Sequence, residues 1–296
     1  MKKLLICSLL ALAMLACGDP ANGEENDNKE PEVENQDPPT PKPEPEPKPE
    51  PEPAPAPNIS KEVPACSIAE FTNWQTHFAS GRTIGDFSGL CFNADRTGLI
   101  GVSNYQGTLW HIGFDGTRDD KHFLWSGRDM EGITLDAATN TIYLCDEEHN
   151  RVYRVPDGAT SVQKMFEFNT GAWDDNSGLE GITYHDGYLY LANQSPARLF
   201  IYSLEHEAMA LSFDADFMKE CFSDLWFDTT NNTLWAVDAW GNEIVNFTIW
   251  GDFIARFKPS AVPWIEGICI DFENNKAWFA CDSTGQLFSA DIVRNN

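Results

Sequence analysis

The sequence predicts an all-β fold, a five-bladed β-propeller. Three observations predict it: a phrase repeated at blade-sized intervals, the same order of short strands after each copy, and an apolar segment ahead of the first copy. The five copies are Ser88–Asn93, Glu131–Asp136, Glu180–His185, Ser223–Asp228 and Glu266–Asp271. They start 43, 49, 43 and 43 residues apart. Repeats of roughly 40 to 45 residues built of short strands bury their apolar faces by packing side by side around an axis.

The second copy shows the strand order most clearly. Residues 132–136 and 141–146 read as two short strands joined by a turn, and residues 151–155 and 162–168 as the third and fourth strands of the same blade. The other copies place their second and third strands at 99–104 and 108–114, 188–193 and 198–204, 233–238 and 243–249, and 276–282 and 286–292.

The last copy runs out after its third strand, as the sequence stops at Asn296. An unpaired strand edge would then face the first blade, and such edges promote aggregation. The apolar segment Ser67–Phe78 has no place in any repeat. We therefore expect this N-terminal segment to supply the missing outer strand and close the ring.

The composition divides the chain into three parts. Residues 1–16 carry two lysines and a short apolar run, which predicts a lipoprotein signal peptide, and Cys17 is the predicted site of acylation. Ordinary cleavage with a free Cys17 thiol is the alternative. Residues 17–58 are acidic and proline-rich, which predicts a disordered stalk, with a proline-rich recognition segment as the alternative. Residues 59–296 form the predicted propeller domain.

The charge and the signal limit the partners and the location. The net charge is −26, and residues 18–60 hold only twelve acidic residues against three lysines, so most of the negative charge falls on the propeller. Such a surface argues against nucleic-acid binding. The expected membrane contact is the N-terminal lipid. We expect a bacterial cell-envelope protein, with acidic residues soon after Cys17 favouring the outer membrane or cell surface over the inner membrane.

Six cysteines follow the stalk, and sequence alone allows fifteen pairings among them. They are Cys66, Cys91, Cys145, Cys221, Cys269 and Cys281. Cys91 and Cys269 occupy equivalent positions in the first and last repeats, which become neighbours when the ring closes. Several of the six lie in apolar strands, which favours buried free thiols over disulfides.

Polar residues converge where the inner strands begin. Glu131, Glu180 and Glu266 open three inner strands, so they should ring one mouth of the central channel. Like charges held close require a cation or a proton among them, and calcium prefers oxygen ligands, so these glutamates are candidate calcium ligands. The alternative is that they accept backbone N–H groups at blade junctions. The ends of the second strands offer further mouth or outer-shell candidates, for which simple turn formation is the favoured reading: Asn104, Asp146, Asn193, Asp238 and Asp282.

Three other sequence features are weaker indications of a functional site. His185 follows an inner strand and should lie on the face opposite the glutamates. Gly85–Gly89 lacks the spacing of a nucleophile elbow, so no serine hydrolase motif is present. Loop tryptophans either line a sugar- or peptide-binding surface or pack between blades; they are Trp173, Trp240, Trp250 and Trp264.

The signal, the Glu-Gly-Ile phrases and the five repeats resemble the SdiA-regulated (YjiK-like) family of exported bacterial propellers, across about Phe71 to Ile292. That resemblance implies a five-bladed, envelope-anchored propeller. The phrase is also similar to that of esterase-like phytases and of SMP-30 and paraoxonase-type lactonases, which have six blades. This second resemblance implies a calcium at the channel mouth, held by a glutamate such as Glu131, Glu180 or Glu266.

The function expected from the sequence is therefore a binding or scaffolding role for a lipid-anchored propeller, with an unknown protein, small molecule or glycan as partner and a calcium in the channel mouth. One alternative is a calcium-dependent hydrolase of esters, lactones or phosphoesters. Another is a surface glycan-binding protein that uses the loop tryptophans.

Overall fold

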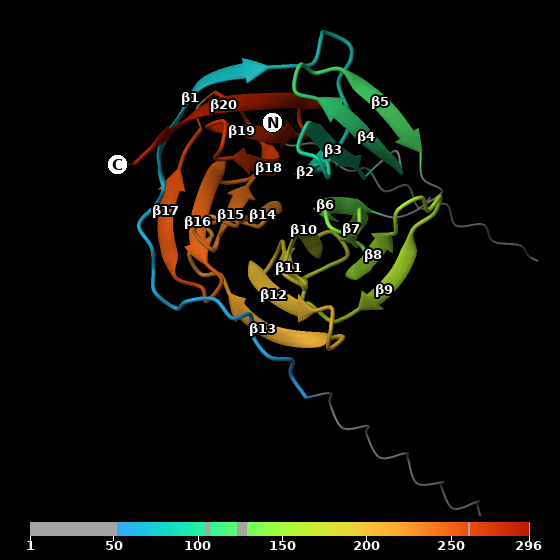
Figure 1. Cartoon of the computed structure of the whole chain (residues 1–296), viewed down its shortest axis with the longest axis vertical. Helices are drawn as coiled ribbons and strands as arrows, with labels where there is room; N and C mark the ends of the chain where they lie inside the picture. Colours follow the sequence, from blue (N-terminus) through green and yellow to red (C-terminus); the bar gives the residue numbers. More distant parts are fainter. Residues whose placement is uncertain (1–51, 105–106, 123–128, 260, 296) are drawn as a thin grey trace, which may run out of the picture. The chain divides into compact units, whose positions relative to one another are not determined.

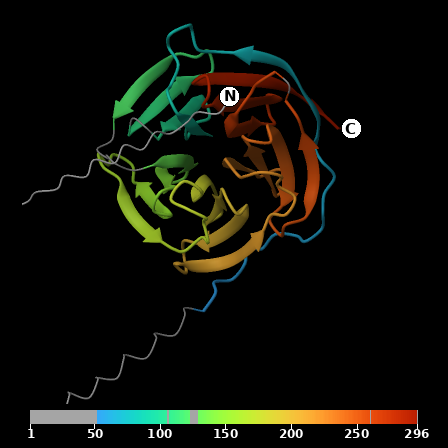
Figure 2. The ribbon, with the colours of Figure 1, turned by 180° about the vertical axis from the view of Figure 1, so that it is seen from behind.

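The computed structural model describes residues 52–104, 107–122, 129–259 and 261–295. Within them, twenty β-strands form five four-stranded antiparallel sheets around one axis, and no helix is present (Figure 1). The predicted five-bladed propeller is confirmed. Figure 2 shows the same ring from its other face. The predicted signal peptide, Cys17 and the stalk up to residue 51 lie outside the described residues.

Each blade uses consecutive strands, apart from the last. Blade 1 contains β2 (Phe87–Phe92), β3 (Gly98–Ser103), β4 (Thr108–Gly113) and β5 (Arg118–His122). Blade 2 contains β6 (Met130–Asp136), β7 (Thr141–Asp146), β8 (Arg151–Val155) and β9 (Gln163–Glu167). Blade 3 contains β10 (Leu179–His185), β11 (Tyr188–Asn193), β12 (Arg198–Ser203) and β13 (Ala208–Asp214). Blade 4 contains β14 (Asp224–Asp228), β15 (Thr233–Asp238), β16 (Glu243–Thr248) and β17 (Phe253–Phe257). Blade 5 contains β18 (Ile265–Asp271), β19 (Lys276–Cys281), β20 (Gln286–Arg294) and β1 (Ile68–Thr76).

The ring closes through β1, as predicted. β1 pairs antiparallel with β20, with Phe71 opposite Ile292 and Thr76 opposite Phe288. It lies at the outer edge of blade 5, beside β20 (Figure 1). The Phe71 ring packs edge-on against Trp235, Phe257 and Phe279, so this one side chain joins blades 4 and 5. The first strand of the domain thus completes the last blade.

The glycine of the repeated phrase is required by the crowding of the inner strands. A Cβ on Gly89 would lie 2.5 Å from the Glu131 carbonyl oxygen, and a Cβ on Gly132 would lie 2.5 Å from the Glu180 carbonyl oxygen. These separations are too short for a side chain. The repeated phrase therefore has two roles: it forms the inner strand of each blade, and its glycine lets neighbouring inner strands approach closely around the axis.

Blade 4 has a buried acidic residue in place of this glycine. It has Asp224 where the other repeats have glycine, and this side chain is fully buried at the centre of the ring. Its carboxylate accepts the Ile268 N–H at 3.0 Å and also interacts with the N–H groups of Leu90 and Ile182. These residues belong to blades 5, 1 and 3. One buried acid therefore ties together inner strands from four blades.

The chain on both sides of residue 59 contacts the propeller. Residues 52–58 fall in the predicted stalk, yet the Ala54 N–H donates to the Met209 carbonyl at 2.9 Å. The Tyr188 hydroxyl donates to the Pro55 carbonyl at 3.1 Å, and the Trp250 indole N–H donates to the Ser60 carbonyl at 3.1 Å. The last residues of the predicted stalk thus contact the propeller, because proline-rich chain still offers carbonyl groups to aromatic donors.

All six predicted domain cysteines are free thiols, as favoured from the sequence. The Cys269 thiol donates to the Leu90 carbonyl at 3.3 Å, which places it in contact with the first blade. Burial raises the pKa of Cys91 and of Cys269, so both stay protonated and unreactive at neutral pH. Among the described residues, no helix is long and apolar enough to cross a membrane.

Candidate metal centre

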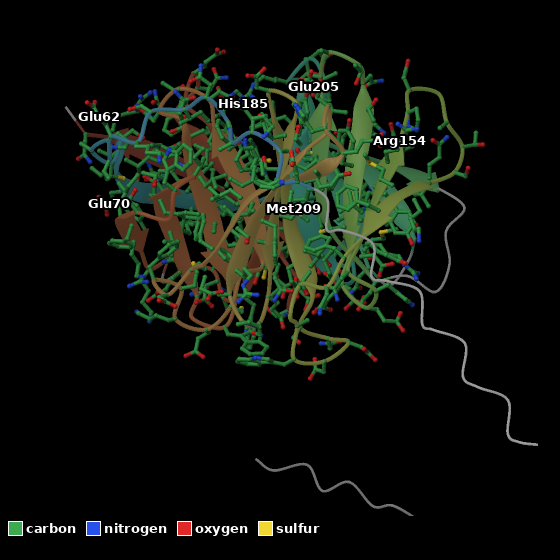
Figure 3. All side chains as sticks on the ribbon, turned by 90° about the horizontal axis from the view of Figure 1, so that it is seen from below. Glu62, Glu70, Arg154, His185, Glu205 and Met209 are labelled. Atoms are coloured by element: carbon green, nitrogen blue, oxygen red, sulfur yellow. The ribbon has the colours of Figure 1, made fainter. Side chains whose placement is uncertain are left out.

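The two faces of the ring carry different chemistry. Every inner strand begins, and every second strand ends, on one face, which we call the mouth face. The inner strands end on the opposite face, where His185 closes β10. Figure 3 shows the ring edge-on, with His185 and Glu205 near the same edge. Glu180 lies near the start of β10 and His185 at its end, so the two residues belong to opposite faces, as predicted.

Three carboxylates converge at the mouth face between blades 1, 2 and 3. Asp129 precedes β6, Glu131 lies within β6, and Glu147 follows β7. One ligand oxygen from each lies within 4.8 Å of the other two. Glu131 and Glu147 are only 5% and 3% exposed. The Asn104 side-chain amide donates to Glu131 Oε1 at 2.8 Å and fixes its orientation. We call Asp129, Glu131 and Glu147 the acidic triad.

The other two predicted glutamates lie beside the triad rather than in it. Glu180, 7% exposed, accepts a hydrogen bond from the Gln194 side chain and feels the charges of Glu131 and Glu147. Glu266 on β18 lies beside Asp282 and also feels Glu131. The structure therefore brings all three predicted glutamates to one mouth, but three-way convergence occurs at the acidic triad.

Burial and mutual repulsion hold protons on these acids. Burial, followed by the charge of Asp129, raises the pKa of Glu131 to about 7. Burial and the charges of Glu131 and Asp129 raise the pKa of Glu147 to about 8. Burial and Asp282 raise the pKa of Glu266 to about 9. Burial and the neighbouring glutamates also raise the pKa of Glu180. Every charged side chain acting on this group is acidic, so a cation would release the protons.

The residue that faces the mouth from each second strand is the one just after the strand. These residues are Asn104, Glu147, Gln194, Ala239 and Asp282. Of the five predicted outer residues, Asn104 and Asp282 occupy this position and contact the glutamates. Asp146, Asn193 and Asp238 each end a strand instead, one residue earlier.

A shift of one residue sends a side chain to the other side of the sheet, so these three residues serve turns and loops. Asp146 lies 3.5 Å from His149 Nδ1. The Asn193 side chain donates to the Pro196 carbonyl at 2.8 Å. Asp238 accepts the Gly241 and Glu220 N–H groups at 2.6 and 3.0 Å. The turn reading favoured from the sequence fits these three residues.

Sequence reasoning missed Asp129 and Glu147. Asp129 stands two residues before the Glu131 phrase, outside the repeat. Glu147 immediately follows Asp146, and only knowledge of where β7 ends shows which of the two faces the mouth. Gln194 and Asp282 occupy the position equivalent to Glu147, directly after the second strand of their blades, but this equivalence is visible only once the strand ends are known.

The acidic triad fits a calcium ion. Its donors are all carboxylate oxygens, which calcium prefers. Glu147 Oε1 is buried and accepts no hydrogen bond from the described residues, so a proton shared with Asp129 or Glu180, or a cation, is needed to satisfy this carboxyl group. Glu131, Glu147 and Asp129 would hold the ion, and Glu180 lies close enough to respond to it.

The rim of the mouth face is aromatic. Trp173 and Trp264 lie in loops that lead into inner strands, and Trp240 lies in the turn between β15 and β16, so all three belong to this face. They are 74%, 47% and 55% exposed, and the expected packing between blades does not apply to them. Trp250 lies in the turn after β16, on the opposite face, where it contacts Ser60.

Comparison by sequence points to one family. Residues 83–210 match a family described as Phytase-like: Esterase-like activity of phytase. This segment contains the whole acidic triad and Glu180, and it covers less than half of the chain. No curated protein matches the sequence. The resemblance to the SdiA-regulated family stays a prediction.

Comparison by structure supports the propeller fold. The chain is similar to a glutaminyl cyclase from Myxococcus xanthus, with 13% identity and a TM-score of 0.55 over 79% of this chain and 100% of that one. It is also similar to a gluconolactonase from Xanthomonas campestris, with 13% identity and a TM-score of 0.51 over 70% and 72% of the two chains. A virginiamycin B lyase from Staphylococcus aureus matches at 16% identity and a TM-score of 0.46, over 69% of this chain and 66% of that one.

The raised pKa values predict how stability depends on pH. Unfolded glutamate has a pKa of roughly 4.3, whereas those of Glu131, Glu147 and Glu266 are about 7, 8 and 9 in the fold. Between these limits the native state binds more protons, so its free energy of unfolding falls as pH rises. In EGTA, we expect the melting temperature to decrease from pH 5 to pH 9. Added calcium should remove most of this decrease, and Glu131→Gln should reduce the slope measured in EGTA. A flat profile in EGTA would contradict the assignment.

Proposed function

We propose that this protein is a calcium-dependent hydrolase that cleaves ester-type substrates, carboxylic or phosphoric, at the mouth face. The observation that carries the proposal is the convergence of three carboxylates, two of them buried, with Glu147 Oε1 accepting no hydrogen bond from the described residues. The similarity of residues 83–210 to the esterase-like phytase family supports it, because the triad lies within that segment.

Different residues around the acidic triad would have different roles in this reaction. A bound calcium would polarise the ester and neutralise charge that develops during its cleavage. Asn104 holds Glu131 in place, and Gln194 holds Glu180. Glu266, whose pKa burial and Asp282 raise to about 9 in the absence of calcium, would be the proton donor to a departing alkoxide if it keeps its proton beside the ion. The exposed tryptophans offer flat surfaces for the rest of the substrate.

A direct test compares substrate classes with and without calcium. The purified protein should be assayed against p-nitrophenyl acetate, a δ-lactone, p-nitrophenyl phosphate and phytate, in calcium and in EGTA. We expect at least one class to be hydrolysed in calcium and not in EGTA. If none is hydrolysed in either condition, or if EGTA has no effect on hydrolysis, the proposal is wrong.

The second candidate is binding without catalysis, as expected from the sequence. The three tryptophans on the mouth face favour it, because large apolar side chains at 47% to 74% exposure commonly mark a contact surface. A glycan is one partner that such flat rings suit. Calcium-dependent retention on a glycan array, together with no hydrolysis of any substrate class, would favour this second function.

We also propose that the domain is tethered to the bacterial envelope through an acylated Cys17, followed by the acidic and proline-rich stalk. The support is the sequence of the signal and of residues 17–51. Multiple acyl chains give lasting attachment, whereas an unmodified N-terminus gives none. Cys17→Ser should move the protein from the membrane fraction to the soluble fraction. An unchanged distribution between the fractions would contradict acylation.

A further inference from the structure

The face opposite the mouth contains a cavity with a different chemical character. Its volume is about 330 Å³, and it lies where the inner strands of blades 1 to 4 end. Pockets that bind small molecules span roughly 300 to 1,000 Å³, so this one has room for a compact ligand. Leu90, Ile133, Leu225 and Phe227 give it an apolar lining.

The polar lining of this cavity includes two buried threonine hydroxyls. Thr134 and Thr183 occupy equivalent positions in blades 2 and 3 and are 6% and 5% exposed. Each hydroxyl oxygen accepts an N–H group from the following blade, from Tyr184 at 3.0 Å and from Phe227 at 3.2 Å. No acceptor for either hydroxyl proton is found among the described residues. Both O–H groups are therefore available to a ligand.

Two of the acidic groups at the cavity are committed to their own turns. Asp136 accepts the Ala138 N–H at 3.0 Å and the Thr139 hydroxyl at 2.7 Å. Asp271, beside the cavity, accepts the Glu273 N–H at 3.0 Å and the Asn274 side chain at 2.8 Å. The third, Asp186, also lines the cavity and is exposed to solvent.

Arg96 supplies the positive charge at the cavity. It lines the cavity, lies over the Phe92 ring at 4.1 Å and reaches Asp271 only at 3.9 Å, with its side chain 47% exposed. Its φ of 56° is rare for a residue with a side chain and is set by the turn between β2 and β3. His185 stacks on Phe227 with 4.0 Å between ring centroids, which gives the cavity a flat aromatic wall.

We propose that this cavity is a second binding site, on the face opposite the mouth, for a small aromatic carboxylate. The carboxylate is bound by Arg96 and by the Thr134 and Thr183 hydroxyls. The aromatic ring lies in the apolar part of the cavity, against the His185 and Phe227 stack. The guanidinium and the two buried hydroxyls are donors suited to an anion, whereas Asp136 is committed to its turn and Asp186 is exposed to solvent. The site is separate from the acidic triad, and its occupancy does not depend on calcium.

Three probes of equal size test the charge assignment. Binding of 1-naphthoate, neutral 1-naphthamide and cationic 1-naphthylmethylamine to the full chain is measured by calorimetry and by saturation-transfer NMR. We expect naphthoate to bind at least about tenfold more tightly than the amide, and the amine not to bind. Equal affinities for the three probes, or no binding of naphthoate at millimolar concentration, would overturn the proposal.

Matched variants locate the site. Arg96→Asn keeps a residue that tolerates a positive φ and removes the charge, so naphthoate affinity should fall about tenfold or more, whereas Arg82→Asn on the mouth face should leave it unchanged. Ala138→Trp should block the cavity and abolish binding. The equivalent turn residue of blade 5 gives the control Glu273→Trp, which should not affect binding. Melting curves establish that each variant is folded. Folded Arg96→Asn or Ala138→Trp protein that binds naphthoate as tightly as the unaltered chain would overturn the proposal.

Discussion

A chain that begins at Gly81 should not fold stably, because it lacks β1. That deletion removes the outer strand of blade 5 and leaves the edge of β20 unpaired. It also removes Phe71, which packs against three aromatic rings of blades 4 and 5. Loss of a buried phenylalanine alone costs about 3–5 kcal/mol, and whole domains are stable by about 5–15 kcal/mol.

The measurement is thermal unfolding followed by circular dichroism. A chain beginning at Glu52 is the matched control, since it keeps β1 and the contacts of residues 54–60. We expect the control to melt within a few degrees of the full chain. The Gly81 chain should be unfolded, or should melt at least about 10 °C lower, since 1 kcal/mol shifts the melting temperature by roughly 2–4 °C at this size. Coincident melting curves would contradict closure by β1.

Glu147→Gln should abolish calcium-dependent stabilisation and hydrolysis together. The change keeps the shape of the side chain and removes the charge that the unpartnered Oε1 would give to an ion. A ligand at a hundredfold its dissociation constant adds about 2.7 kcal/mol to stability, and this increment should disappear. Hydrolysis should fall at least about tenfold, because several kcal/mol of charge stabilisation depend on the ion.

The same variant shows whether Glu147 is a calcium ligand or has only a structural role. Without calcium, Glu147→Gln should be as stable as the unaltered protein or more stable, because it relieves repulsion from Glu131 and Asp129. Glu148→Gln is the control, as Glu148 lies in the same turn but its side chain is 49% exposed and outside the triad. If Glu147→Gln keeps the full calcium response, or if Glu148→Gln loses it, the triad is not the site.

Much of the fold could be read from the sequence, because it repeats. The spacing of five phrases set the blades, and an unassigned apolar segment identified β1. Even the glycine of Glu-Gly-Ile has a physical reason, since a Cβ on Gly132 would collide with the Glu180 carbonyl. The stalk boundary was less predictable, because the contacts of Pro55 and Ser60 depend on Tyr188 and Trp250, which are far away in the chain.

The candidate site was predicted only in part, for a geometric reason. Glutamates that open inner strands reach the mouth in any propeller, so Glu131, Glu180 and Glu266 were accessible to sequence reasoning. The residues opposite them depend on where each second strand ends. Because β7 ends at Asp146, the next residue, Glu147, faces the mouth instead. A single sequence does not predict the end of a strand to within one residue. Asp129 lies outside the repeated phrase, and only its proximity in space connects it with Glu147.

The central claim is that the acidic triad binds calcium, and calorimetric titration of the chelator-treated protein tests it most directly. We predict one calcium per chain, with a dissociation constant of about 10⁻³ M or tighter, as in extracellular calcium sites. Affinity should be higher at pH 8 than at pH 6, because Glu131 and Glu147 must lose protons to bind the ion. Glu131→Gln and Glu147→Gln should each abolish the binding heat. The absence of calcium binding at millimolar concentration, or equal binding by both variants, would contradict the account.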